Sequence, residues 1–188
     1  MKIFITGGTG FVGKTLAPAL VRSGHEVSIL TRAAKEGSSG ISWIEGDPTQ
    51  KGKWQDAVKE HEAVINLAGA SIFTRWTEEA KQKIRDSRIL TTRHLVEALE
   101  GGKGKAFLST SAVGYYGFHG DEILSEEASP GGDFLALLAK DWEAEAKEAE
   151  KKGCRVVITR FGIVLGEKGG ALGQMIPLFN KYLGGPLG

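Results

Sequence analysis

Residues 8–15 read GTGFVGKT and contain the residue types that bind phosphate groups. Counted from Gly8, they fit G-x-x-x-x-G-K-[ST], the loop that holds nucleoside triphosphates; counted from Gly7, they fit G-x-x-G-x-x-G, a turn that binds dinucleotides. In both, backbone N–H groups at a glycine-rich bend and at the start of a helix contact the anion. The flanking sequence has to decide between them.

The surrounding residues favour a dinucleotide. A triphosphate loop needs an Asp at the end of an apolar strand to help hold Mg²⁺, and the apolar runs AVINLAG, AFLSTS and VVITRF do not end in Asp. A dinucleotide site needs a strand, a glycine turn, a helix and a second strand, which KIFIT, GGTGFVG, KTLAPALVRSG and HEVSILTR supply in order. Gly7 then permits the tight turn, Gly10 lets the backbone approach the pyrophosphate, and Gly13 lets the helix pack closely. Triphosphate hydrolysis remains a third hypothesis, which Mg²⁺-dependent ATP turnover would revive.

The end of the second strand indicates which dinucleotide is bound. An acidic residue there would accept hydrogen bonds from the ribose 2′-hydroxyl of NAD, but this strand ends in Thr31 and Arg32. A guanidinium can pair with the additional 2′-phosphate of NADP. The sequence therefore predicts NADP rather than NAD; the alternative is that Arg32 is only a solvated strand-end residue.

Short apolar runs alternate with helical patterns along the whole chain. We predict strands at 2–6, 25–32, 40–47, 62–69, 105–112 and 154–162, and helices at 11–24, 53–60, 77–101 and 133–153. Asp133 is a candidate cap for the last helix and Gly153 its stop. This alternation predicts an α/β fold, a Rossmann-type doubly wound parallel sheet with helices on both faces, in one domain over residues 1–188.

Composition restricts the partners. The 188 residues carry a formal net charge of +1, which gives no electrostatic reason to expect nucleic acid or an anionic membrane. We expect no metal site, because the single Cys154 and the four scattered histidines form no ligand pattern. Cys154 is expected in the core. We expect a cytoplasmic protein, because no signal peptide or membrane-spanning run is visible.

Six segments together resemble the extended short-chain dehydrogenase/reductase superfamily, and within it the nucleoside-diphosphate-sugar-epimerase-like family. They are ITGGTGFVG, VINLAGASI, SRILTTRHLVEAL, STSAVGYYG, FLALLAKDWEAEA and VVITRFGIVLG. The resemblance covers nearly the whole chain. It implies that GGPLG lies well before the end of such a protein, so that the C-terminal substrate-binding part is mostly absent here.

The resemblance also implies roles for individual residues. The expected cofactor contacts are Gly7, Thr9, Gly10, Phe11, Val12, Gly13, Thr31, Arg32, Asp47, Leu67, Ala68, Gly69, Arg88 and Arg160. Among these, Asp47 is expected beside the adenine, Leu67–Gly69 along the adenosine, and Arg160 near the nicotinamide. Ser111 matches the serine that hydrogen-bonds the reacting carbonyl or hydroxyl.

The usual acid/base pair of that superfamily, Tyr-x-x-x-Lys, is missing. If Glu143 is the alignment anchor, Leu135 takes the tyrosine position and Ala139 the lysine position. Lys140 is one residue away, which turns it by about 100° around a helix. Tyr116 is a candidate replacement for the proton donor; the alternative is that Tyr115 and Tyr116 only form a pocket wall.

The charged run DWEAEAKEAEKK is expected to be a solvated helix face with pairs such as Glu143–Lys147 and Glu148–Lys152. The helices at 77–101 and 133–153 offer a face for a homodimer.

Two functions remain open from the sequence. One is an NADP-dependent oxidoreductase or epimerase that acts on a small carbonyl or hydroxyl substrate, with a nucleotide sugar as the family-level expectation. The other is a non-catalytic NADP-binding sensor or interaction module that has lost the acid/base pair.

Overall fold

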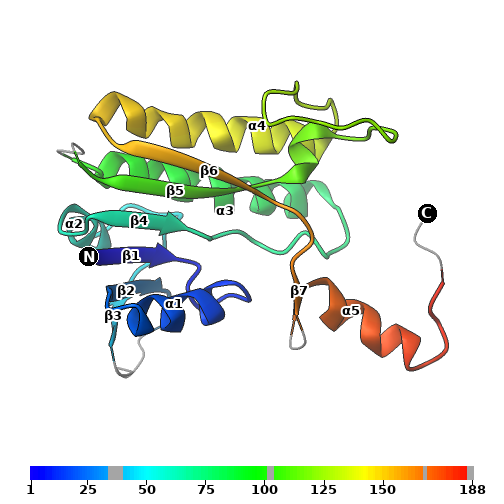
Figure 1. Ribbon diagram of the computed structural model, residues 1–188, viewed down its shortest axis with the longest axis horizontal. Helices are drawn as coiled ribbons and strands as arrows, with labels where there is room; N and C mark the ends of the chain where they lie inside the picture. Colours follow the sequence, from blue (N-terminus) through cyan, green and yellow to red (C-terminus); the bar gives the residue numbers. More distant parts are fainter. Residues whose placement is uncertain (34–39, 101–103, 167–168, 186–188) are drawn as a thin grey trace.

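The centre of the molecule is a six-stranded parallel sheet (Figure 1). The structure, a computed structural model, describes residues 1–33, 40–100, 104–166 and 169–185. The strands are β1 (Lys2–Thr6), β2 (Glu26–Thr31), β3 (Ile41–Glu45), β4 (Ala63–Asn66), β5 (Ala106–Ala112) and β6 (Arg155–Phe161). Their order, β3-β2-β1-β4-β5-β6, is that of doubly wound dinucleotide-binding sheets and confirms the predicted fold class.

Helices cover both faces of the sheet. Helix α1 (Gly13–Arg22) packs on one face; α2 (Trp54–Lys59), α3 (Glu78–Ala98) and α4 (Phe134–Lys147) cover the other. The alternation of side chains along β1 shows how one strand serves both layers: Ile3 and Ile5 join the α1 layer, and Phe4 joins the layer of α2, α3 and α4. Cys154 is buried in that second layer, as predicted.

Most local signals are confirmed, with shifted boundaries. The Asp133 carboxylate accepts hydrogen bonds from the N–H groups of Leu135 and Ala136 at 2.8 and 3.1 Å, which caps α4. Gly153, at φ +81°, ends the segment as a left-handed residue. However, α4 itself ends at Lys147 and continues as the 3₁₀ helix η2 (Glu148–Lys152). The helix predicted to begin at residue 11 begins at Gly13, because residues 11 and 12 belong to the turn.

The last elements were not predicted. A short strand β7 (Leu165–Gly166) leads into α5 (Gly170–Phe179), which lies beyond the carboxyl ends of the sheet strands in Figure 1. The sequence GALGQMIPLF does not indicate a helix, because its two glycines and Pro177 have low helix propensity. Among the helices described, none has the length and apolarity that crossing a bilayer requires.

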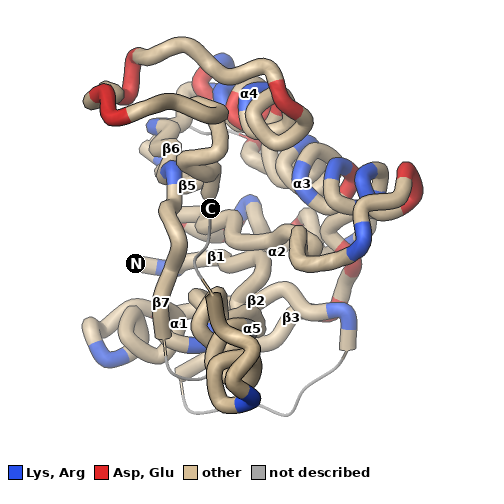
Figure 2. Tube along the Cα trace, turned by 90° about the vertical axis from the view of Figure 1, so that its right-hand side faces the viewer, with Lys and Arg blue, Asp and Glu red and all other residues tan. Residues whose placement is uncertain are grey.

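Helices α3 and α4 lie side by side and are joined by exposed ion pairs. Arg85 contacts Asp141 at 2.7 Å, and Arg93 contacts Glu145 at 2.8 Å. Charges of both signs are mixed over these helices (Figure 2). Their outer faces as a homodimer interface remain a prediction.

A buried chain of hydrogen bonds fixes the ends of the two central strands. The Thr6 hydroxyl donates to Asn66 Oδ1 at 2.7 Å, and Asn66 Nδ2 donates to the Thr92 hydroxyl at 2.9 Å. Trp142 of α4 also donates to Thr92, at 2.8 Å. Buried polar groups are costly unless paired, so this chain holds β1, β4, α3 and α4 in one arrangement directly below the glycine turn.

Candidate cofactor and active site

The glycine turn follows β1 at the carboxyl edge of the sheet, where the strand order reverses. Gly7 has φ +69°, and a Cβ atom there would lie 2.5 Å from the Leu67 carbonyl oxygen. A Cβ on Gly13 would lie 2.5 Å from the Gly7 oxygen. Both distances are far below van der Waals contact, so the turn requires glycine at these two positions. The close approach also places Leu67 and Ala68 directly beside the turn.

The start of α1 presents unbonded backbone donors. Val12 caps the helix without a side-chain hydrogen bond, and the first turn contains no acidic residue. Within the described residues, no protein acceptor bonds the N–H of Phe11, Val12 or Gly13. Free N–H groups together with the positive end of the helix dipole attract an anion. The ring of Phe11 lies beside Gly169, where a Cβ would lie 2.6 Å from its Cδ2.

At the end of β2 the structure places Arg32 in an exposed position immediately after Thr31. The Thr31 hydroxyl donates to the Ala33 carbonyl at 3.1 Å. Opposite Thr31 in the sheet stands Glu45, the last residue of β3. Arg32 therefore places a cation after β2, the strand whose end contacts the ribose in this fold. Glu45 places a carboxylate at the end of the neighbouring strand β3.

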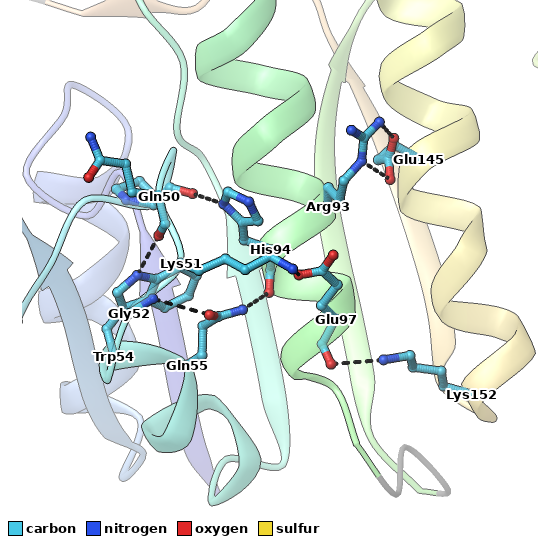
Figure 3. Close-up of polar contacts among 11 residues, drawn as sticks. Gln50, Lys51, Gly52, Trp54, Gln55, Arg93, His94, Glu97, Glu145 and Lys152 are labelled. Carbon is cyan, nitrogen blue, oxygen red and sulfur yellow. Dashed lines mark hydrogen bonds and ion pairs between the residues drawn. The ribbon is translucent and has the colours of Figure 1, made fainter.

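The segment between β3 and α2, residues 46–53, is held against α3 and is called the Asp47 loop. Asp47 Oδ1 accepts hydrogen bonds from the N–H and hydroxyl of Thr49 at 2.8 and 2.7 Å. The ring of His94, with the residue only 8% exposed, contacts the Pro48 carbonyl through Nδ1 at 3.0 Å. Gln55 donates to the His94 carbonyl at 2.9 Å, and Lys51 pairs with Glu97 at 2.9 Å. Figure 3 shows the contacts of His94 and Glu97, which join the loop and α2 to the C-terminal part of α3.

The side chain of Arg88, on α3, lies beside Gly69 in the segment that follows β4. A Cβ on Gly69 would lie 3.1 Å from the guanidinium carbon. Arg88 Nη1 donates to the carbonyls of Ala70 and Ile84 at 3.1 and 3.0 Å, and the guanidinium lies 5.4 Å from the Trp142 ring centroid. Within the described residues it has no carboxylate partner. Burial lowers the pKa of Arg88 below its usual value, because removing the guanidinium from water disfavours its charged form. A phosphate group of a bound ligand would supply the negative charge that compensates this cation.

Ser111 does not face the open edge of the sheet. The residue is 1% exposed, and its hydroxyl donates to Glu143 Oε1 at 2.6 Å. Arg160 of β6 binds the same carboxylate with two parallel hydrogen bonds, from Nε at 2.7 Å and Nη2 at 2.8 Å. Burial acts to raise the pKa of Glu143, but the hydrogen bonds from Arg160 and Ser111 outweigh it and lower this pKa below its usual value.

The solvated-face prediction for this part of α4 is wrong at Glu143. The residue is buried and pairs with Arg160 rather than with Lys147. Glu148 pairs with Lys151, and Lys152 donates instead to the Glu97 carbonyl. The i,i+4 rule treats an isolated helix, whereas here β6 presents an arginine to the buried side of α4.

Arg160 also reaches the tyrosine loop that follows β5. Its Nη1 donates to the Tyr116 phenol oxygen at 2.7 Å and to the Glu126 carbonyl at 2.7 Å. The guanidinium carbon lies 3.7 Å from the Tyr115 ring centroid. The tyrosines form η1 (Val113–Tyr116) directly after β5, so Tyr116 and Ser111 are joined through Arg160 and Glu143.

No tyrosine or lysine occupies the positions expected for the usual acid/base pair. Ala139 is buried, whereas Lys140 is exposed on the neighbouring helix face. Leu135 is partly buried at the first turn of α4. The described residues also contain no cluster of His, Cys, Asp or Glu able to hold a metal ion.

The structure gathers many of the predicted residues into two groups at the carboxyl ends of the strands, whereas Thr31, Arg32 and Asp47 lie apart from both, at the ends of β2 and β3. The glycine turn lies with Leu67–Gly69 and Arg88; Ser111 lies with Arg160 and Tyr116. Sequence reasoning missed His94, Asn66 and the role of Glu143. Asn66 could have been found as the polar residue that ends an apolar strand, but nothing in the sequence pairs His94 with the Asp47 loop.

The residues of the first group fit a dinucleotide. The tight approach at Gly7 and Gly13, the unbonded N–H groups at the start of α1 and the uncompensated Arg88 are features that an anionic ligand would satisfy. The Tyr–Lys positions, in contrast, offer no group to hold a ribose.

Comparisons with known proteins agree with this geometry. The model of the NAD dependent epimerase/dehydratase family matches residues 3–185. The "Epimerase family protein SDR39U1 homolog, chloroplastic" of Arabidopsis thaliana is 38% identical over 196 residues, covering 100% of this chain and 56% of its own length. The "Epimerase family protein YfhF" of Bacillus subtilis is 40% identical, covering 100% of this chain and 63% of its own length.

Among solved structures, the human epimerase family protein SDR39U1 (isoform 2) with NADPH superimposes with a TM-score of 0.81 at 32% identity, covering 100% of this chain and 62% of that one. The chain therefore spans only part of the length of these relatives. On the glycine turn, the strand order and the match over nearly all its residues, the chain belongs to the NAD dependent epimerase/dehydratase family.

Proposed function

We propose that this chain binds NADP(H) at the carboxyl edge of its sheet and forms the cofactor half of an oxidoreductase or epimerase that acts on a small carbonyl or hydroxyl substrate. A nucleotide sugar is the substrate class suggested by the family. The observation that carries the proposal is the glycine turn, with Gly7 and Gly13 in close contact below the unbonded N–H groups of α1. The human relative solved with NADPH supports the same cofactor.

In this proposal, different residues of the chain bind different parts of the cofactor. The turn from Gly7 to Gly13, with Thr9, Phe11 and Val12, holds the pyrophosphate; Thr31 and Arg32 bind the 2′-phosphate. Asp47 and Leu67–Gly69 border the adenosine, and Arg88 compensates a ligand phosphate. When bound, NADP(H) supplies or accepts a hydride at its nicotinamide ring.

At the other end of the edge, Tyr116 is the candidate proton donor. Ser111 was expected to bind the reacting oxygen, and this stays a prediction. Its single hydrogen is already donated to Glu143, so we infer that Ser111 acts by positioning that carboxylate.

Two observations favour a second candidate, a non-catalytic NADP-binding sensor or interaction module. Leu135 and Ala139 replace the usual acid/base pair, and Ser111 is buried.

The test that separates the candidates is NADPH oxidation, followed by absorbance, with a panel of aldehydes, ketones and nucleotide sugars, alongside calorimetric NADPH binding to the same preparation. The chain is assayed alone and in parallel with a full-length relative such as the Bacillus protein. Binding with turnover supports the enzyme, binding without turnover supports the sensor, and no binding contradicts both.

A further inference from the structure

Arg160 joins a phenol to a buried carboxylate in a geometry that proton transfer can use. Its Nη1 lies 2.7 Å from the Tyr116 phenol oxygen, and its guanidinium carbon lies 5.0 Å from the Tyr116 ring centroid. The Tyr115 ring lies closer, at 3.7 Å, and covers one face of the cation. The cation therefore has a fixed aromatic support on one side and the phenol oxygen at its end.

The guanidinium is held so that it cannot turn away from Tyr116. Two parallel hydrogen bonds join it to Glu143, and the side chains of Arg160 and Glu143 are only 15% and 4% exposed. Ser111 donates to Glu143 from the other side, and the Glu126 carbonyl accepts from Nη1. Planar two-point pairing fixes orientation as well as distance. The hydrogen bond to Glu143 raises the pKa of Arg160 further, so the cation persists at every working pH.

The phenol retains a proton to give. Its oxygen accepts from Arg160, and within the described residues no acceptor takes the phenol's own hydrogen. Tyr116 is partly exposed, at the end of η1 and at the carboxyl edge of the sheet. A cation at hydrogen-bond distance stabilises the negative charge that develops on a phenol oxygen as its proton leaves.

We propose that Tyr116 and Arg160 together replace the missing Tyr-x-x-x-Lys pair, with Tyr116 as the catalytic proton donor and Arg160 as its cationic partner. Glu143 and Ser111 are positioning residues that hold Arg160. This inference rests on the proposed enzyme function. It assigns Arg160 to the support of the proton donor Tyr116, whereas the family resemblance implied a contact between Arg160 and the cofactor.

The reaction balances as a carbonyl reduction. The substrate carbon gains a hydride from bound NADPH while the phenol O–H bond breaks and a new O–H bond forms on the substrate oxygen. The resulting phenolate is paired with the Arg160 cation until solvent returns a proton. In the oxidative direction the same steps run in reverse.

A test independent of turnover measures how readily Tyr116 reacts as a nucleophile. In the reaction with benzenesulfonyl fluoride the phenol oxygen forms a bond to sulfur, fluoride leaves and the phenol proton passes to solvent. The chain contains three tyrosines, so peptide mass spectrometry can follow Tyr115, Tyr116 and Tyr182 separately. Tyr182 is 96% exposed and serves as the internal reference, and Tyr116→Phe confirms the assignment of the labelled peptide.

We expect Tyr116 to be labelled about tenfold faster than Tyr182 despite its lower exposure, because a hydrogen bond from the Arg160 cation to the phenol oxygen stabilises the negative charge that develops there as the proton leaves. The double variant Arg160→Met/Glu143→Leu removes the cation without leaving a buried carboxylate unpaired, and we expect it to abolish the excess. If the double variant does not fold, Arg160→Lys takes its place, since lysine lacks the fork that reaches Glu143 and Tyr116 together, and labelling of Tyr116 should fall.

Labelling of Tyr116 slower than that of Tyr182, or rapid labelling that the Arg160 variants leave unchanged, overturns the pairing. The assay requires neither cofactor nor substrate. A failure of NADPH binding or turnover, which would count against the proposed function, is therefore measured separately from a failure of this inference.

Discussion

The Ser111 hydroxyl lies 2.6 Å from Glu143 Oε1, so the serine predicted to bind the reacting oxygen donates its hydrogen to a carboxylate of helix α4. Ser111 is on the same side of β5 as Ser109 and Phe107, which are also buried. Because a hydroxyl carries one hydrogen, the contact to Glu143 occupies the only donor that Ser111 has.

Replacing Ser111 with alanine should lower the free energy of unfolding by about 1.5–3 kcal/mol, because it removes a hydrogen bond to a charged group. Ser109→Ala is the matched control: Ser109 is equally buried in the same strand, but no partner contacts its hydroxyl within the described residues. Urea denaturation of both variants makes the comparison. Equal losses would show that the Ser111–Glu143 contact adds nothing.

Glu143→Gln should destabilise the protein by about 3 kcal/mol near neutral pH, because it leaves Arg160 as an uncompensated buried cation. The pKa of Glu143 is lowered in the folded state from its ordinary value of 4.5. Its stabilising contribution is therefore fully present above pH 4.5 and disappears as the pH falls through the lower folded-state pKa. Denaturation of wild type and variant from pH 7 to pH 3 should show the gap between them closing only at the acidic end. A gap that is constant with pH would contradict the assigned ion pair.

Arg32→Ala should weaken NADPH binding by about tenfold or more, since charge-assisted hydrogen bonds contribute about 1.5–3 kcal/mol each. NADH binding should stay the same, because NADH lacks the 2′-phosphate. Calorimetric titration with both nucleotides measures the preference. Glu45→Gln is a useful comparison, because Glu45 lies opposite Thr31 in the sheet; if this variant, and not Arg32→Ala, alters the preference, the 2′-phosphate is read elsewhere.

His94→Phe should weaken binding of 2′,5′-ADP by about fivefold, corresponding to about 1 kcal/mol for one hydrogen bond, because the Asp47 loop loses its contact through Pro48. Binding of nicotinamide mononucleotide should not change. His94→Asn keeps an N–H donor at a similar reach and should recover much of the affinity. Loss of affinity for both fragments, or no loss for 2′,5′-ADP, would show that His94 only supports the core.

The cofactor half of the site could be predicted because its determinants are local. The spacing of Gly7, Gly10 and Gly13 sits inside one strand–turn–helix segment, and the alternation of strands and helices determines which edge it occupies. The absence of a Tyr-x-x-x-Lys pair in α4 was equally readable, because it concerns Leu135 and Ala139, two positions one turn apart on one helix.

The other half could not be predicted because it depends on pairs of residues distant in the chain. Glu143 and Arg160 meet only because β6 returns beside β5 under α4, and the charged letters around Glu143 fit a solvated face equally well. His94 meets Pro48 across the gap between α3 and the Asp47 loop. No periodicity of one element encodes such contacts.

The most direct test of the account is calorimetric titration of NADPH into wild type and Gly10→Ala. A Cβ on Gly10 would lie 3.1 Å from the Gly7 oxygen, so the variant requires a shift of a few tenths of an ångström in the turn, and urea denaturation checks that it folds. Its methyl group should block the approach of a pyrophosphate to the turn. We predict saturable one-to-one binding to the wild type and a loss of at least about tenfold in affinity for the variant, equivalent to about 1.4 kcal/mol. Equal affinity for the two proteins, or no binding to the wild type, would contradict the assignment of this turn as the cofactor site.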